Sequence, residues 1–195
     1  MADRIRTAIF GGTFNPIHNG HIAIARAVVE SGLADELWLM VTPQNPWKRN
    51  MQLMPDSYRL QLVKSAVSAI SDVRASDYEF SLPKPSYTAN TLRSLERDYP
   101  ERTFSLIIGA DNWVKFSNWY DSQYILEHYH IIVYPRPGFD TGAITSGNVS
   151  LLDCPLIDVS STEIRERLAS GLPVNGMVPD EILGSLALYQ TDGIS

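Results

Sequence analysis

Short apolar runs alternate with segments of helical spacing along this chain, and the alternation constrains the fold more than any other feature. Four runs rich in β-branched residues are expected to form strands, namely Ile5 to Phe10, Leu37 to Val41, Phe104 to Ile108 and Ile131 to Tyr134. Helical faces between the runs are marked by Ile22, Ala25 and Val29 and by Leu60, Val63, Val67 and Ile70. The pattern predicts an α/β fold with an open, doubly wound parallel sheet, in which ligands bind beyond the carboxyl ends of the strands.

Length and charge narrow the possible functions. A chain of 195 residues that is 44% apolar can bury one sizeable core, so we expect a single domain over residues 1–195. The net charge of -6 argues against a general nucleic-acid binder, which needs a basic surface. The apolar run that ends at Phe10 is too short to span a membrane and carries no signal-peptide cleavage pattern, so we expect a cytoplasmic protein without a membrane partner.

The single cysteine, Cys154, excludes an internal disulfide framework and a Cys-rich zinc site. It lies in an apolar stretch between Leu151 and Ile157. We therefore interpret it as a packed strand residue rather than a nucleophile.

Two glycines and two histidines follow the first predicted strand. Gly11 and Gly12 allow a backbone N–H to approach an anion, although two glycines after a strand also suit an ordinary turn. The spacing is neither the dinucleotide-binding nor the Walker pattern. His18 and His21, three residues apart at the expected start of a helix, can face one site where free N–H groups attract phosphate. The alternatives are a helix capped by Asn19 with incidental histidines, or a metal pair, for which no further ligands lie nearby.

The stretch Gly11-Gly12-Thr13-Phe14-Asn15-Pro16-Ile17-His18-Asn19-Gly20-His21 resembles the signature of the nucleotidylyltransferase superfamily, in the form typical of nicotinate-nucleotide adenylyltransferases. The resemblance implies a Rossmann-like fold and an adenylyl transfer from ATP. It assigns ATP binding to Gly11, Gly12, Thr13 and Phe14 and catalysis to His18 and His21. Asn15 departs from the family's aspartate, which removes a charge.

The resemblance extends to two later loops. In Thr42-Pro43-Gln44-Asn45-Pro46-Trp47-Lys48-Arg49, Lys48 matches the family lysine that reaches the ATP phosphates, whereas Trp47 replaces the common histidine. In Ser86-Tyr87-Thr88-Ala89-Asn90-Thr91-Leu92, Thr88 matches the threonine that contacts the nicotinate carboxylate. Without the resemblance, the first loop reads as solvated surface and the second as helix capping.

An acid and an aromatic cluster follow the strand that ends at Ile108. Asp111 matches the family's ribose-binding aspartate in a G-x-D pattern, and Trp119 matches the tryptophan that stacks on the pyridine ring. Helix capping by Asp111 and core packing of Trp113, Phe116, Trp119 and Tyr120 are the structural alternatives. Arg136 matches a family arginine, though less specifically.

The last string is Val159-Ser160-Ser161-Thr162-Glu163-Ile164-Arg165, which begins a helix expected to run to about Ala169. Ser160 and Glu163 have the spacing of a capping box, while Ser161 and Arg165 share a face above the helix start. The string resembles the family's I-S-S-T-x-I-R, which assigns ATP binding to Ser160, Ser161, Thr162 and Arg165, and catalysis to Arg165.

These residues together predict an adenylyl transfer from ATP to nicotinate mononucleotide, with Mg²⁺ held mainly by the ATP phosphates and no dedicated metal site in the protein. Two rival functions stay open. One is another superfamily activity, such as that of pantetheine-phosphate adenylyltransferase or a cytidylyltransferase. The other is a nucleotide-sensing module without turnover. The sequence leaves both a monomer and a homo-oligomer open, and it does not settle the preference between nicotinate and nicotinamide mononucleotides.

Overall fold

The computed structural model describes residues 4–43, 53–139 and 147–192, and its described part forms a six-stranded sheet with the strand order β3-β2-β1-β4-β5-β6. Every strand pair in this sheet is parallel. The strands are β1 (Ile5–Gly12), β2 (Glu36–Val41), β3 (Val73–Ser76), β4 (Arg102–Gly109), β5 (His130–Tyr134) and β6 (Val149–Leu151). The open, doubly wound parallel sheet is therefore confirmed.

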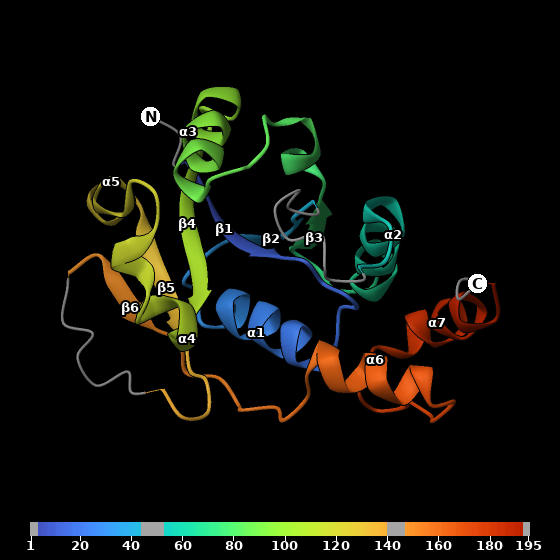
Figure 1. Cartoon of the computed structure of the whole chain (residues 1–195). Coiled ribbons are helices and arrows are strands. Elements are labelled where there is room, and N and C mark those ends of the chain that lie inside the picture. The colour runs from blue at the N-terminus through green and yellow to red at the C-terminus, as the bar shows by residue number, and fades with distance from the viewer. Residues whose placement is uncertain (1–3, 44–52, 140–146, 193–195) are drawn as a thin grey trace.

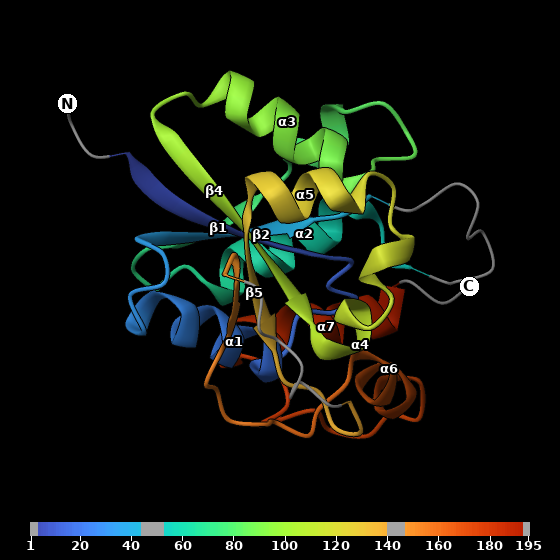
Figure 2. The same ribbon diagram turned by 90° about the vertical axis from the view of Figure 1, so that its left-hand side faces the viewer.

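Helices cover both faces of the sheet (Figure 1). The α-helices are α1 (Asn19–Glu30), α2 (Asp56–Ala66), α3 (Thr88–Asp98), α4 (Ala110–Trp113), α5 (Ser122–His128), α6 (Ser161–Ala169) and α7 (Asp180–Asp192), and the 3-10 helices are η1 (Tyr78–Ser81) and η2 (Phe116–Asn118). Figure 2 shows α3 and α5 on one side of the sheet and α1, α6 and α7 on the other.

Strand side chains alternate between two cores, as a pleated strand requires. In β1, Ala8 and Phe10 pack with residues of α1, α2, α6 and α7, whereas Ile9 packs with residues of α3 and α5. In β2, Leu39 faces the first of these cores and Trp38 faces the second. A sheet buried on both faces accounts for the nearly continuous apolar runs in the sequence.

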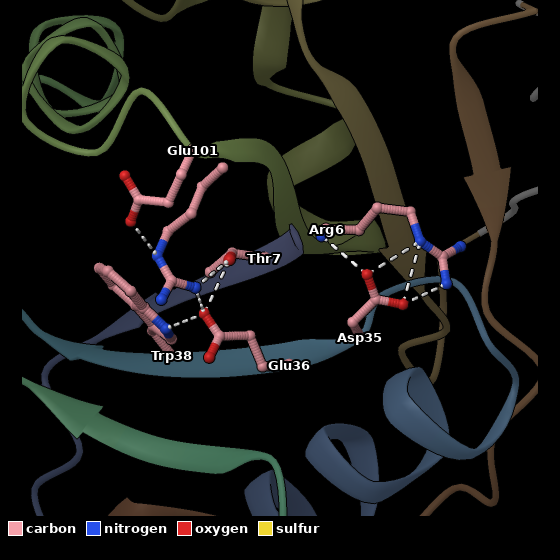
Figure 3. A network of polar contacts seen from close by, with 7 residues as sticks. Arg6, Thr7, Asp35, Glu36, Trp38 and Glu101 are labelled. Carbon is pink, nitrogen blue, oxygen red and sulfur yellow. Dashed lines mark hydrogen bonds and ion pairs between the residues drawn. The ribbon is translucent and has the colours of Figure 1, made fainter. Parts of the chain in front are cut away.

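A polar network ties the amino-terminal ends of the central strands together, at the edge opposite the loops with the sequence motifs (Figure 3). Glu36 Oε1 accepts hydrogen bonds from Thr7 Oγ1 and Trp38 Nε1, each at 2.8 Å, and forms an ion pair with Arg102. The same carboxylate oxygen thus joins β1, β2 and β4. A second pair, Arg6 and Asp35, is mostly exposed.

The structure corrects two sequence expectations and excludes one of the alternatives. Cys154 is not a strand residue, because β6 ends at Leu151 and Pro155 has no N–H to donate to a ladder, although Cys154 does pack against the core. The helix expected over Leu60 to Ile70 ends at Ala66. Asn19 does not cap α1, since His18 is the N-cap and the Asn19 amide donates to the Gly176 carbonyl at 2.8 Å.

Candidate functional site

The strand order reverses between β1 and β4, and this is where an open α/β sheet binds its ligands. The chain first moves outward from β1 through β2 to β3 and then returns to the other side of β1 with β4. A cavity of about 240 Å³ lies at this point and is lined by Gly11 at the end of β1 and Gly109 at the end of β4. Thr88 and Trp119, two of the predicted acceptor residues, line the same cavity.

His18 and His21 stack on each other at the start of α1, with ring centroids 3.7 Å apart. His18 is buried at 5% exposure, and the backbone N–H of His18 donates to His21 Nδ1 at 3.2 Å. A Cβ atom on Gly20 would lie 3.1 Å from His18 Nδ1, so the glycine between the histidines allows this packing. The sequence His18-Asn19-Gly20-His21 therefore places two imidazole rings in direct contact.

Both imidazoles are neutral near pH 7. Burial, followed by the nearby Arg136 charge, lowers the pKa of His18 to about 4. Burial also lowers the pKa of His21, with further contributions from His18 and Arg136. Because Nδ1 of neutral His21 accepts a hydrogen bond, its proton resides on Nε2, which is thus a donor.

The start of α6 contacts the loop that carries the histidines. Ser161 Oγ donates to the Pro16 carbonyl at 2.9 Å, and Arg165 Nη1 donates to the Asn15 carbonyl at 2.9 Å. The Ser160 half of the predicted capping box is present, since Ser160 Oγ accepts from the Glu163 N–H at 3.1 Å. The exposed Thr162 hydroxyl accepts from Arg165 Nη2 at 3.1 Å. Two helix starts, α1 and α6, are therefore joined through one loop.

Asn15 has a structural role that needs no charge. The side chain is buried, and Oδ1 accepts a hydrogen bond from the Met54 N–H at 3.0 Å. An amide oxygen serves this purpose as well as a carboxylate does. The departure from the family's aspartate is accommodated at this contact.

Asp111 and Arg136 face each other beside the cavity, with Arg136 Nε 3.6 Å from Asp111 Oδ1. Arg136 Nη2 also donates to the Tyr134 hydroxyl at 3.1 Å. A Cβ atom on Gly109 would lie 2.4 Å from Asp111 Oδ1 and 3.0 Å from the Tyr134 hydroxyl, so a side chain at this position would displace the carboxylate of Asp111. Asp111 belongs to the first turn of α4, whose N-cap is Gly109, so Asp111 does not cap that helix.

A second, smaller cavity of about 30 Å³ is lined by His18, His21, Arg136 and Cys154, among other residues. Tyr134 lines both cavities, so they adjoin at this side chain. The structure thus gathers the predicted residues in two adjoining groups, the histidine group and the group of Thr88 and Trp119.

Some of the remaining predicted residues lie near the cavities, and others lie outside the described part of the chain. The Phe14 ring is buried against Phe10 and His21, so a contact of Phe14 with ATP would use its backbone. Trp119 packs on Phe116 and also lines the larger cavity, which makes core packing and ligand contact compatible. Gly12 is the last residue of β1, and Thr13 begins the loop that follows it. Trp47 and Lys48 lie outside the described residues.

Two further residues of the site were missed by the sequence analysis. Arg59, a fully buried arginine in α2, donates to the carbonyls of Thr13, Thr42 and Met54 and pairs with Asp56. Glu79 is buried in the wall of the larger cavity. Neither residue stands in a motif, and the contacts of Arg59 with Thr13 and Thr42 join segments far apart in sequence, so no local pattern could have found them.

Within the described ranges, no three His, Cys, Asp or Glu side chains are grouped so that they could hold a metal ion. None of the helices described is long and apolar enough to cross a membrane.

The sequence and the fold have counterparts among known proteins. Residues 9–167 match the family model described as cytidylyltransferase-like, which defines the chain as a nucleotidyltransferase of that class. A probable nicotinate-nucleotide adenylyltransferase of Bacteroides fragilis is 46% identical, over 98% of this chain and 95% of the relative. One from Cytophaga hutchinsonii is 41% identical, over 91% and 93%. The chain belongs to the nicotinate-nucleotide adenylyltransferase family.

A solved structure supports the fold independently. The nicotinic acid mononucleotide adenylyltransferase of Plasmodium falciparum, complexed with NaAD, superposes with a TM-score of 0.79 at 18% identity, covering 95% of this chain and 96% of that one. At this identity the likeness concerns the fold alone.

Proposed function

We propose that this protein transfers the adenylyl group of Mg–ATP to nicotinate mononucleotide, giving nicotinate adenine dinucleotide and pyrophosphate. The observation that carries the proposal is the stacked pair His18 and His21 beside the start of α6, in a chain of this family. The acceptor assignment draws on the names of the relatives and on the resemblance at Thr88, Asp111 and Trp119.

ATP is proposed to bind across the starts of α1 and α6. Helix amino termini carry free N–H groups and partial positive charge, which suit phosphate oxygens. Gly11, Gly12 and Thr13 supply backbone groups, Ser160, Ser161 and Thr162 supply hydroxyls, and Arg165 supplies a guanidinium. Lys48 is proposed to reach the phosphates from its loop. Mg²⁺ enters as part of this substrate, held mainly by the phosphates.

Nicotinate mononucleotide is proposed to occupy the larger cavity. Trp119 offers a flat face to the pyridinium ring, and the start of α3 at Thr88 offers donors to its carboxylate. Asp111 accepts from ribose hydroxyls, and Arg136 contacts a phosphate.

The proposed reaction needs no general base. The acceptor phosphate is already ionised at neutral pH, and one of its oxygens attacks the α-phosphorus of ATP in line while pyrophosphate leaves. The protein brings two anions together and stabilises the charge that develops. The Nε2 proton of His21 is available for a phosphate oxygen, and a bound anion favours further protonation of the pair.

The test compares His21→Ala with the wild type. We expect turnover to fall by about 100-fold or more, because one donor to a transition-state oxygen is lost, while the Kd for ATP changes only a few-fold. Pyrophosphate release gives the turnover and calorimetry gives the Kd. His128→Ala, which alters an exposed histidine on α5, is the matched control. Near-normal turnover in His21→Ala would overturn the proposed role.

A further inference from the structure

Glu79 is an acid in the wall of the acceptor cavity that has no role in the mechanism above. It lies in η1 and is 8% exposed. Among the described residues that line the cavity, it is the only acidic or basic side chain. The cavity therefore has an ionisable group close to the hydroxyls of Thr42, Ser86 and Thr91.

The two carboxyl oxygens of Glu79 differ in their contacts. Oε1 accepts a hydrogen bond from Thr91 Oγ1 at 2.9 Å. Oε2 is buried, and it forms no hydrogen bond within the part of the chain that the structure describes. Thr91 lies one helical turn after Thr88 on α3, so Glu79 and the predicted acceptor threonine belong to one wall of the cavity.

The surroundings of Glu79 shift its carboxyl toward the neutral form. Burial raises the pKa of the carboxyl, and the nearby hydroxyls of Thr91, Thr42 and Ser86 oppose this only in part. These groups belong to α3, to the end of β2 and to the segment before α3, and none of them carries a charge. Tyr134 is the other titratable side chain in the described lining, and burial raises its pKa as well. A neutral carboxylic acid donates one hydrogen bond through its O–H.

We propose that Glu79 is a specificity-determining residue: when the carboxylate of the acceptor ring lies beside it, the two buried carboxylates retain one proton, and Glu79 donates a hydrogen bond through Oε2. The inference rests on the proposed function. A carboxylate only accepts hydrogen bonds, so it fits a wall of donors made by Glu79, by the hydroxyls and by the start of α3. The carboxamide of nicotinamide mononucleotide instead points two N–H groups at this wall of donors. Some of the buried donors then have no acceptor, and an unpaired buried donor weakens binding strongly.

Ionisation of Glu79 has the opposite effect, because a buried negative charge repels the carboxylate. The preference for nicotinate mononucleotide over nicotinamide mononucleotide should therefore decline as the pH rises and Glu79 loses its proton. Glutamine at this position retains an N–H donor that does not titrate.

The experiment measures KM and kcat for both mononucleotides between pH 6 and 9, with Mg–ATP in excess, in the wild type, E79Q and E79L. We expect E79L to raise the KM for nicotinate mononucleotide about tenfold or more, with a smaller change for nicotinamide mononucleotide. E79Q should stay within about threefold of the wild type at low pH and should lose the pH dependence of the preference. Glu127→Gln, an exposed change on α5, is the matched control.

Three outcomes separate the possibilities. A preference in E79L equal to that of the wild type, with a lower thermal midpoint, would mean that Glu79 only supports the fold and would overturn the inference. A wild-type preference that rises with pH would also overturn it. If the wild type releases no pyrophosphate with nicotinate mononucleotide at any pH, the proposed function fails instead.

Discussion

His18 shows at the scale of one residue how packing sets the charge of the site. Its imidazole is buried against His21 and lies near Arg136, and both burial and the charge of Arg136 disfavour a proton on His18. The folded protein therefore holds a neutral imidazole where the unfolded chain holds a titratable one. A site for anions is thus assembled without a permanent charge on either histidine.

This difference predicts how stability depends on pH. The pKa of His18 is lower in the folded state, so the unfolded chain binds more protons between about pH 6.5 and about pH 4. The free energy of unfolding should therefore fall as the pH drops through this window, and His18 should account for about 3 kcal/mol of the decrease. Denaturant unfolding at pH 7, 5.5 and 4.5 measures this decrease in the free energy of unfolding. His18→Gln should lose stability less steeply than the wild type, whereas His128→Gln should match the wild type. An equal slope in His18→Gln would contradict the account.

Sequence reasoning at this scale succeeded where a residue stands in a spaced motif. The pairing of His18 with His21 and the cap at Ser160 followed from spacing alone and are present in the structure. The roles assigned to Lys48, Thr88, Asp111 and Arg165 stay predictions. Glu79 could not be found, because a single acid beside two aromatic residues has no spacing that separates it from a surface residue.

At the scale of elements, α2 holds the loops that form the site. Arg59 reaches from this helix to carbonyls at the ends of β1 and β2, in the loops that carry Thr13 and Thr42. A fully buried guanidinium with several acceptors is a rigid connection. The position of the glycine and histidine loop depends on α2 as well as on the strand before it.

Replacing Arg59 by alanine should destabilise the fold. Arg59→Ala leaves buried carbonyls without donors and should lower the free energy of unfolding by about 3 kcal/mol. Arg97→Ala removes an arginine that is 71% exposed and should change it by less than about 0.5 kcal/mol. Chemical denaturation compares the two variants. Equal midpoints for Arg59→Ala and the wild type would show that the loops do not depend on this arginine.

The strands that sequence reasoning missed are short and lie at the edges of the sheet. β3 has four residues and β6 has three, too few for a pattern, and their pairing with β2 and β5 defines them. The end of α2 was placed too late because Val67 and Ile70 continue the apolar spacing. Both still pack on the core after the helix has ended at Ala66.

At the scale of the whole molecule, the net charge of -6 is compatible with anionic substrates because cations gather locally. Arg136 lies beside the histidines and Arg165 beside the loop that carries them. The reversal of strand order brings this region next to the acceptor cavity. The alternation of strands and helices was enough to predict the sheet, and a cavity lies at the edge where ligands were expected, whereas the acceptor depended on family resemblance.

The most direct test of the central claim is pyrophosphate release from Mg–ATP with each acceptor in turn. We expect rapid release with nicotinate mononucleotide, formation of nicotinate adenine dinucleotide in equal amount, and little release with phosphopantetheine or without an acceptor. CTP in place of ATP should give little product. Release with phosphopantetheine instead, preference for CTP, or ATP binding without release for any acceptor would contradict the account.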